Sequence, residues 1–242
     1  MNDKNTFIIG YDLLFFQQYG LKIPITAPIG HSIIFGSSGS GKSVATLYLI
    51  YKMKKLPLEI WIIDFKASHE FQGIVPDERY AEFEASYEKI CQFHEMFIKL
   101  PEGGDKNIKI LIIDEVAGLL NFFSMNKEGK SKADRIRLIM ADILMMGRSR
   151  KCFLWLSMQR YSAGIFPSAS GAGDNFHMCL GLGRLSVEAR KGIFAGEHFP
   201  GEEDILFGRA KGIVLIDGQP LQAIILPYVS KEKLLGYLQE YH

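Results

Sequence analysis

The sequence lacks several features that would assign it to a particular class of protein. It contains three cysteines in 242 residues, none of them in a Cys-x-x-Cys pair. An odd, scattered set of thiols indicates neither a disulfide framework nor a metal motif, and it is typical of a cytoplasmic protein. The formal net charge is only +1. No overall positive field therefore favours nucleic acid, and any contact with DNA must come from local basic patches.

Long hydrophobic runs are also missing. The longest, such as Ile60–Ile63 and Ile110–Ile113, have the length of a strand and end at a carboxylate. A membrane-spanning helix needs about 20 apolar residues. The start of the chain, Met1–Thr6, is polar, and no signal peptide follows it. We therefore expect a cytoplasmic protein without a transmembrane segment, which works at a membrane only if a partner recruits it.

Short apolar runs alternate with helical stretches along most of the chain. The runs are dense in isoleucine, as in strands that are covered on both faces. The expected strands are Ser32–Phe35, Glu59–Ile63, Lys109–Ile113, Cys152–Ser157 and Met178–Leu182, and the expected helices are Lys42–Lys54, Glu84–Leu100, Lys132–Met146 and Ser186–Phe194. This alternation predicts an α/β fold with a mainly parallel central sheet and helices on both faces.

The two ends of the chain have different patterns. Near the C-terminus, Gly212–Ile216 and Leu221–Leu226 flank an Asp-Gly pair, which predicts a β-hairpin, and a final helix follows it. We expect a short strand-rich lead-in over residues 1–29 and one domain over residues 30–242.

The most specific motif follows the first of the expected strands. Residues 36–43 match the pattern G-x-x-x-x-G-K-[ST] of a phosphate-binding loop (P-loop), between an apolar strand and an apolar helix. Glycines let successive N–H groups face one point, and the helix adds its positive N-terminal end. Lys42 should reach the β- and γ-phosphates, and the Ser43 hydroxyl should bind Mg²⁺. The predicted nucleotide-binding residues are Gly36, Ser37, Ser38, Gly39, Ser40, Gly41, Lys42, Ser43 and Val44.

Two carboxylates, Asp114 and Glu115, end the strand Lys109–Ile113. Acids at the tip of a buried strand are costly unless they bind something. In P-loop enzymes an Asp at this point holds Mg²⁺, mostly through water, and an adjacent Glu polarises the attacking water. We assign Asp114 and Glu115 to these two roles. The alternative is a pair of solvated acids at a strand end, and the single acid Asp64 after the preceding strand is a weaker signal of the same kind.

Further blocks between about Gly30 and about Phe207 carry a family resemblance. They are Ile62–Lys66, similar to I-D-P-K; Ile113–Leu120, similar to D-E-F-A-D-L-M; Gly147–Leu154, similar to A-R-A-A-G-I-H-L; Leu156–Arg160, similar to A-T-Q-R-P; and Leu185–Arg190, similar to V-S-S-x-x-D-S-R. In this order the motifs resemble the motor domain of FtsK/SpoIIIE-type DNA translocases, and more distantly HerA and the conjugative coupling ATPases. Phe65 and Tyr161 replace prolines of the family pattern.

The resemblance implies a RecA-like P-loop fold, ATP and Mg²⁺ as cofactors, and ATP hydrolysis stimulated by DNA. By position, Arg148 corresponds to the arginine finger, which would reach the γ-phosphate bound by a neighbouring subunit, and Arg150 is a competing candidate. Gln159 corresponds to a polar sensor of the γ-phosphate. Lys42, Glu115, Arg148 and Gln159 are thus the candidate catalytic residues. Either arginine could instead pair with surface acids. A finger that acts between subunits implies a homo-oligomer, in this family a hexameric ring.

Two segments are candidates for DNA contact. The first, Asn121–Lys132, carries Lys127, Lys130 and Lys132, and the second, Arg160–Asn175, is rich in Gly, Ser and Ala. Lysines attract phosphates, and backbone N–H groups contact them without regard to base sequence. The resemblance would place both segments as loops in the channel of a ring. The alternative is that both are ordinary surface loops.

The predicted function is an ATP-hydrolysing motor that translocates double-stranded DNA as a ring, in DNA transfer or mobile-element maintenance. The small size resembles stand-alone versions found on mobile elements, and a membrane or DNA-processing partner fits this hypothesis. One alternative is a coupling ATPase that feeds DNA or protein into a secretion or conjugation channel. Another is a nucleotide-dependent switch without motor activity. The presence of both Glu115 and Arg148 argues against a switch, which needs neither residue for binding alone.

Overall fold

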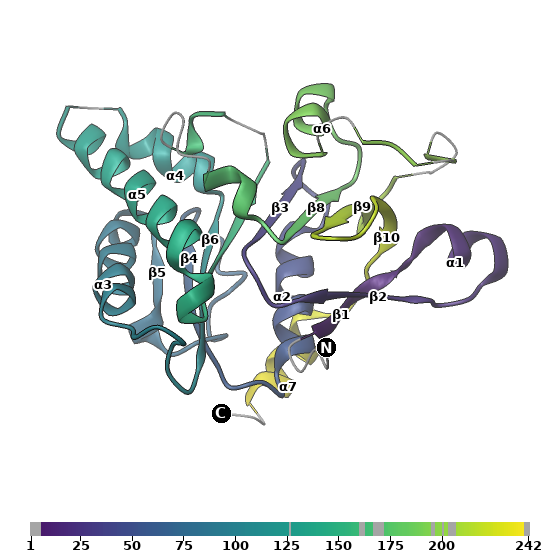
Figure 1. The fold of residues 1–242 in the computed structure, drawn as a ribbon, viewed down its shortest axis with the longest axis horizontal. Helices are drawn as coiled ribbons and strands as arrows, with labels where there is room; N and C mark the ends of the chain where they lie inside the picture. The colour runs from purple at the N-terminus through teal and green to yellow at the C-terminus, as the bar shows by residue number, and fades with distance from the viewer. Residues whose placement is uncertain are drawn as a thin grey trace. The chain divides into compact units, whose positions relative to one another are not determined.

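The structure is a computed structural model (Figure 1). It describes residues 6–125, 127–159, 163–166, 172–194, 197–199, 201–202 and 207–239. The chain forms two compact units. The first comprises Met1–Lys55, Gln159–Tyr161 and His177–His242, and the second comprises Leu56–Met158 and Ser162–Phe176.

Among the described residues, six strands form the sheet of the first unit, in the order β2-β1-β10-β9-β8-β3. β3 and β8 run parallel, and the remaining neighbours pair antiparallel. The predicted C-terminal hairpin is β9–β10, and β1 pairs with β10, so the N-terminal strands extend the same sheet. The strands are β1 (Thr6–Asp12), β2 (Pro24–Pro28), β3 (Ser32–Gly36), β8 (Met178–Leu182), β9 (Lys211–Ile216) and β10 (Gln222–Ile225).

In the first unit, α2 (Lys42–Met53) contacts both β1 and α7 (Lys231–Gln239), whereas α1 (Leu13–Tyr19) contacts β1 and β10. The residues of α2 from Ala45 to Ile50 are all buried, which is why this stretch is almost wholly apolar. α1 lies between β1 and β2, and it ends at Gly20, whose φ of 67° suits glycine. α6 (Val187–Phe194) follows β8. The boundary that we expect at residue 30 stays a prediction.

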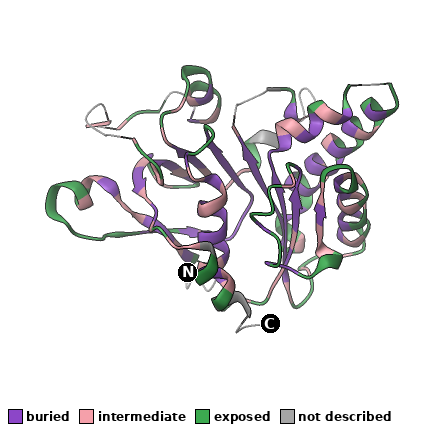
Figure 2. Ribbon diagram, turned by 180° about the vertical axis from the view of Figure 1, so that it is seen from behind, coloured by how far each residue is buried: buried purple, intermediate pink, exposed green. Residues whose placement is uncertain are grey.

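The second unit has four strands among its described residues, all parallel, in the order β7-β6-β4-β5. β6 and β7 are buried along their whole length (Figure 2), which matches the apolar runs Ile110–Ile113 and Cys152–Leu156 within them. Asp64 at the end of β4 lies opposite Asp114 at the end of β6. The elements are β4 (Leu58–Asp64), β5 (Tyr80–Glu82), α3 (Ser86–Ile98), β6 (Ile108–Asp114), α4 (Val116–Phe123), α5 (Lys127–Met146) and β7 (Cys152–Met158), with short 3₁₀ turns between them.

The α/β class predicted from the sequence is confirmed, and so is each of the expected strands, with ends that shift by one residue at most. Parallel strands form the second unit and the β3–β8 pair, and the antiparallel strands extend the first unit beyond β8. Among the described residues, no helix is long and apolar enough to cross a membrane.

The predicted loop Asn121–Lys132 is wrong. α4 continues to Phe123, and α5 begins at Lys127, so the three candidate lysines lie in the first turns of a helix. The physical reason is packing of the inward face of α5, which already includes Gly129, buried one turn before Ala133. In the second candidate segment, residues 160–162 and 167–171 lie outside the described residues, and 163–165 and 172–175 form 3₁₀ turns.

Candidate functional site

The phosphate-binding loop leaves the end of β3 and enters α2 within the first unit. Gly36 passes close to its neighbours, because a Cβ there would lie 2.7 Å from the Leu182 carbonyl oxygen and closer still to the Ser40 hydroxyl. Gly39 and Gly41 have φ angles of 78° and 100°, in the left-handed region that favours glycine. The three glycines of the motif are therefore required by the backbone path, as the sequence pattern predicts.

Lys42 is buried, and its ammonium group lies against the loop itself. Nζ donates hydrogen bonds to the Gly36 carbonyl at 2.8 Å and to the Ser37 carbonyl at 3.2 Å. These bonds hold a positive charge at the loop, where the sequence predicts the β- and γ-phosphates.

The first turn of α2 directs backbone N–H groups into the same region. Ala45 N donates to the Gly41 carbonyl at 2.8 Å, which is the first bond of the helix. The N–H groups of Ser43 and Val44 come before that bond, in the first turn of the helix, where backbone N–H groups can bind an anion. Ser43 and Val44 are half-buried, while Ser37, Ser38 and Gly39 are exposed. The loop can therefore accept a ligand from solvent.

Asp114 and Glu115 end β6 in the second unit, and both are buried. Glu115 has φ 56° and ψ 49°, a left-handed conformation, at the N-cap position of α4, where its side chain makes no capping hydrogen bond. This conformation costs a residue other than glycine about 1–2 kcal/mol. Strained residues of this kind cluster at active sites. The observation agrees with a functional role for Glu115, whose assignment as the base stays a prediction.

Lys66 holds the Glu115 carboxylate, a contact that the sequence analysis missed. Lys66 Nζ donates to Glu115 Oε2 at 2.9 Å, and the side chains are 42% and 10% exposed, respectively. Lys66 follows the end of β4, which pairs with β6 in parallel. The order of the strands in the sheet could have indicated this contact. Two adjacent parallel strands place their C-terminal ends side by side, so a lysine after one can reach an acid after the other.

Asp64, the third strand-end acid, is fully buried and held within the second unit. Its carboxylate accepts hydrogen bonds from the Ser68 hydroxyl, at 3.0 Å to Oδ2, and from the Tyr80 hydroxyl at 3.2 Å. Burial and the carboxylates of Glu82 and Asp64 raise the pKa of Tyr80 well above its usual value, so its hydroxyl keeps its one proton, which Glu82 Oε1 at 2.6 Å and Asp64 Oδ2 at 3.2 Å share as acceptors. Asp64 therefore has a structural network around it.

The structure separates the two candidate finger residues. Arg150 Nη1 donates to the Phe97 carbonyl at 3.1 Å, and its guanidinium lies 5.0 Å from the centroid of the Phe97 ring. Arg150 thus caps the C-terminal end of α3. Arg148 is exposed, and within the described part of the chain its side chain has no hydrogen-bond or ion-pair partner. Arg148 is the arginine that is available to a ligand. Gln159 directly follows β7 and is half-buried.

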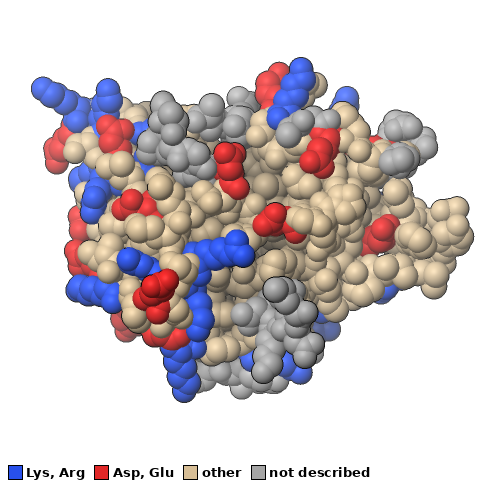
Figure 3. All heavy atoms as spheres, in the orientation of Figure 1, with Lys and Arg blue, Asp and Glu red and all other residues tan. Residues whose placement is uncertain are grey.

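The candidate DNA-binding lysines differ from one another. Lys127 and Lys130 are exposed, whereas Lys132 is half-buried, with Nζ 5.3 Å from the centroid of the Tyr87 ring. In the space-filling view, basic side chains lie over the start of α5 together with acidic ones (Figure 3, upper left). Lys127 and Lys130 are therefore the accessible members of the predicted set.

The described residues do not form a metal site from protein side chains alone. In the part of the chain that the structure describes, no group of three or more His, Cys, Asp or Glu side chains could hold an ion. The predicted ligands Ser43 and Asp114 fit Mg²⁺ by chemistry, because this ion binds a few protein oxygens together with phosphates and water. Both remain predicted ligands.

The phosphate loop belongs to the first unit, and Asp114, Glu115 and Arg148 belong to the second. Within the second unit, the structure brings Lys66 and Glu115 together.

No protein-family model and no curated protein matches this sequence. Among solved structures, the pCW3 conjugation coupling protein TcpA, in a monomer form with ATPγS, matches with a TM-score of 0.75 and 15% identity, over 100% of this chain and 72% of TcpA. The cytoplasmic domain of the type VII secretion ATPase EccC from Thermomonospora curvata matches with a TM-score of 0.68 and 15% identity, over 99% of this chain and 31% of EccC.

A third similar structure is the genome packaging NTPase B204 from Sulfolobus turreted icosahedral virus 2, in complex with ATPγS. It matches with a TM-score of 0.53 and 17% identity, over 83% of this chain and 98% of B204. The chain thus spans only about a third of the EccC domain, so the activity of that whole protein does not transfer to it. At 15–17% identity these similarities show the fold, and the RecA-like α/β fold that the motifs predict is confirmed.

Proposed function

We propose that this protein is an ATP-hydrolysing motor that binds and translocates double-stranded DNA as a ring-shaped homo-oligomer, as a hexamer in the family pattern. The observation that carries the proposal is the phosphate loop between β3 and α2, with the Lys42 ammonium 2.8 Å from the Gly36 carbonyl oxygen. A positive charge and a turn of N–H groups gathered in one loop suit a triphosphate. The fold shared with TcpA, EccC and B204 supports the same activity.

Each residue has a defined part in the proposed reaction. The loop N–H groups and Lys42 would neutralise the β- and γ-phosphates, and Ser43 and Asp114 would hold Mg²⁺ through their side-chain oxygens. Glu115 accepts a proton from the attacking water. Arg148, from a neighbouring subunit, stabilises the charge that develops on the γ-phosphoryl group. The Mg²⁺ ion would add a positive charge beside the phosphates.

The alternative function is a coupling ATPase that feeds DNA or protein into a secretion or conjugation channel. The two functions differ in the molecule that is moved. TcpA is described as a conjugation coupling protein, EccC as a secretion ATPase and B204 as a genome packaging NTPase. Two exposed lysines at the start of α5, Lys127 and Lys130, favour DNA, because exposed cations supply the salt-dependent part of phosphate binding. A secretion protein that copurifies with the chain would instead favour the coupling role.

Steady-state ATP hydrolysis with and without double-stranded DNA tests the motor. Lys42→Ala should abolish ATP binding, since it removes the main charge on the β- and γ-phosphates. Glu115→Gln should bind Mg·ATP yet hydrolyse it about 10²- to 10⁴-fold more slowly, because it keeps the shape and removes the base. Unchanged nucleotide affinity in Lys42→Ala would refute the site, and unchanged turnover in Glu115→Gln would refute the assigned base.

DNA binding has its own test. The double variant Lys127→Ala, Lys130→Ala should bind duplex DNA more weakly and with a smaller dependence on salt, by about one unit of slope for each phosphate that the protein no longer neutralises. The matched control is Lys99→Ala, Lys106→Ala, which removes two exposed lysines elsewhere in the second unit. Equal DNA affinity in the two double variants would show that the start of α5 is not the DNA-binding surface.

A further inference from the structure

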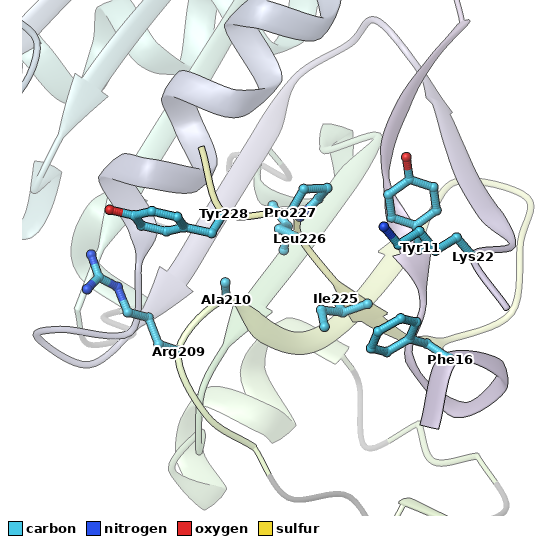
Figure 4. A pocket seen from close by; sticks show the side chains of 9 residues that line it. All are labelled: Tyr11, Phe16, Lys22, Arg209, Ala210, Ile225, Leu226, Pro227 and Tyr228. Atoms are coloured by element: carbon cyan, nitrogen blue, oxygen red, sulfur yellow. The ribbon is translucent and has the colours of Figure 1, made fainter. Parts of the chain in front are cut away.

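A cavity of about 420 Å³ opens on the first unit, beside the phosphate loop (Figure 4). Its volume falls within the range of small-molecule sites, roughly 300–1,000 Å³. The end of β10 and the residues after it, Ile225 to Tyr228, form one wall, and Arg209 and Ala210 before β9 form another. Tyr11 of β1 lines the opposite side, where β1 packs against α2.

Arg209 and Ala210 connect this cavity directly to the phosphate loop. Ala210 N donates to the Ser40 carbonyl at 3.1 Å, and a Cβ placed on Gly41 would lie 3.6 Å from Arg209 Cγ. The Ala210 carbonyl accepts from Leu226 N at 2.8 Å, so the same residue also joins the two walls. The cavity and the loop therefore share a wall, and both belong to the first unit.

The lining is mostly apolar and aromatic, which suits a flat ring, and Lys22 and Arg209 are its basic side chains. Leu226, Pro227 and Ile225 supply apolar surface, and Tyr228 presents an aromatic face that is 71% exposed. The Arg209 guanidinium lies 5.9 Å from the centroid of the Tyr228 ring, and the two side chains lie near one another in Figure 4. Aromatic rings and guanidinium groups are the two kinds of surface on which nucleobases stack.

The backbone conformation of Ala210 indicates that this wall of the cavity is held in place. Its φ is 61°, in the left-handed region, which is unusual for a residue with a side chain. Such conformations occur where the surrounding structure over-determines them, often at ligand clamps. Here the hydrogen bonds to Ser40 and Leu226 hold the residue.

We infer that this cavity binds the nucleobase of the nucleotide whose phosphates occupy the loop, with Tyr228 as the stacking residue. The inference rests on the proposed ATPase function and extends it to the base. Phosphates that lie at Lys42 carry the ribose and base to an adjoining surface, and the wall at Arg209 and Ala210 adjoins the loop. Stacking recognises the face shared by all bases, so the site should discriminate little between ATP and GTP.

Binding of Mg·ATPγS and of Mg·tripolyphosphate, which lacks both ribose and base, tests the inference by calorimetry. Tyr228→Ala should raise the Kd for ATPγS by about tenfold, or 1.4 kcal/mol, within the range for base stacking on an aromatic side chain. Its Kd for tripolyphosphate should not change. Tyr228→Phe should keep the wild-type affinity for both ligands. The control Tyr19→Ala removes another exposed tyrosine of the same unit that does not line the cavity.

Two results would overturn the base site: wild-type affinity of Tyr228→Ala for ATPγS, or an equal loss of affinity for both ligands. The base site would also be overturned if the wild-type protein bound tripolyphosphate as tightly as ATPγS. Failure of the proposed function has a different signature. In that case Lys42→Ala would bind ATPγS as the wild type does, because the loop would not hold the phosphates.

Discussion

Replacing Lys66 by methionine should slow ATP hydrolysis about 10- to 100-fold while leaving ATP binding unchanged. Lys66 donates to only one oxygen of Glu115, Oε2, at 2.9 Å. The carboxylate is thereby held in one orientation and keeps Oε1 available to accept a proton. Without the lysine, the side chain can rotate, and a displacement of about 1 Å at a reacting group can cost about 100-fold in rate.

The effect of this substitution on stability should be much smaller. The Glu115 side chain is 10% exposed, but that of Lys66 is 42% exposed, so solvent screens much of the pair. A fully exposed pair contributes about 0–1 kcal/mol, and a buried hydrogen bond to a charged group about 1.5–3 kcal/mol. We therefore expect a loss of about 1 kcal/mol, which for a chain of this size lowers Tm by about 2–4 °C. Methionine keeps the length of the aliphatic chain and its packing.

The assay is steady-state hydrolysis together with the Kd for Mg·ATPγS. Lys66→Arg should retain part of the rate, because it keeps a cation at this position, and Lys99→Met, an exposed lysine of the same unit, is the matched control. Adding Lys66→Met to Glu115→Gln should slow hydrolysis no further, since both changes act on one group. A wild-type rate in Lys66→Met would refute the orienting role. A faster rate would refute it too, and would indicate that the ion pair restrains the base.

Three other parts of the molecule carry predictions of their own. Arg148→Ala should bind ATP without hydrolysing it, and mixing it with Lys42→Ala should restore part of the activity, because a mixed interface pairs an intact loop with an intact finger; full activity of a dilute monomer would contradict this. Gly36→Ala should weaken nucleotide binding and lower Tm, since its Cβ would lie 2.7 Å from the Leu182 carbonyl oxygen; unchanged binding and Tm would show that the loop can shift at little cost. Lys109 is buried between Glu59 and Asp105, at 2.8 and 2.9 Å, so Lys109→Met should lower the free energy of unfolding by about 2–3 kcal/mol at pH 7. Although burial opposes it, hydrogen bonds from Lys109 and Trp61 hold the pKa of Glu59 below its usual value, so the stabilisation is present above pH about 4.3 and is lost as pH falls through the lowered pKa. Chemical denaturation at pH 7 and pH 3 measures both values, and an equal difference between wild type and variant at the two pH values would contradict the linkage.

Local patterns in the sequence predicted the parts of this protein that depend on neighbouring residues. The strands before the phosphate loop and before Asp114 contain continuous apolar runs, and a buried parallel strand requires that composition wherever it lies. The glycines of the loop could be predicted for the same reason, because the backbone path through residues 36–41 excludes a Cβ at Gly36 and favours glycine at Gly39 and Gly41.

A loop was wrongly predicted at Asn121–Lys132 because the Gly, Ser and Lys content of the segment was weighed, and the helical spacing of its buried residues was not. Gly129 and the lysines around it suggested a loop, yet Gly129 is buried on the inward face of α5, four residues before Ala133. A small residue at that point lets the helix pack closely. Helix propensity is a weak local preference, and packing of the apolar face overrides it here.

The sequence by itself determined the local elements of this protein: the loop with the phosphate-binding pattern, two strand-end acids and an α/β order of elements, because each is encoded within a few adjacent residues. Only the tertiary structure decided which side chains meet. Lys66 and Glu115 are 49 residues apart, Arg150 reaches Phe97 across 53, and Ala210 bonds to Ser40. Contacts of this kind depend on strand pairing and helix packing, whose register arises from the whole fold.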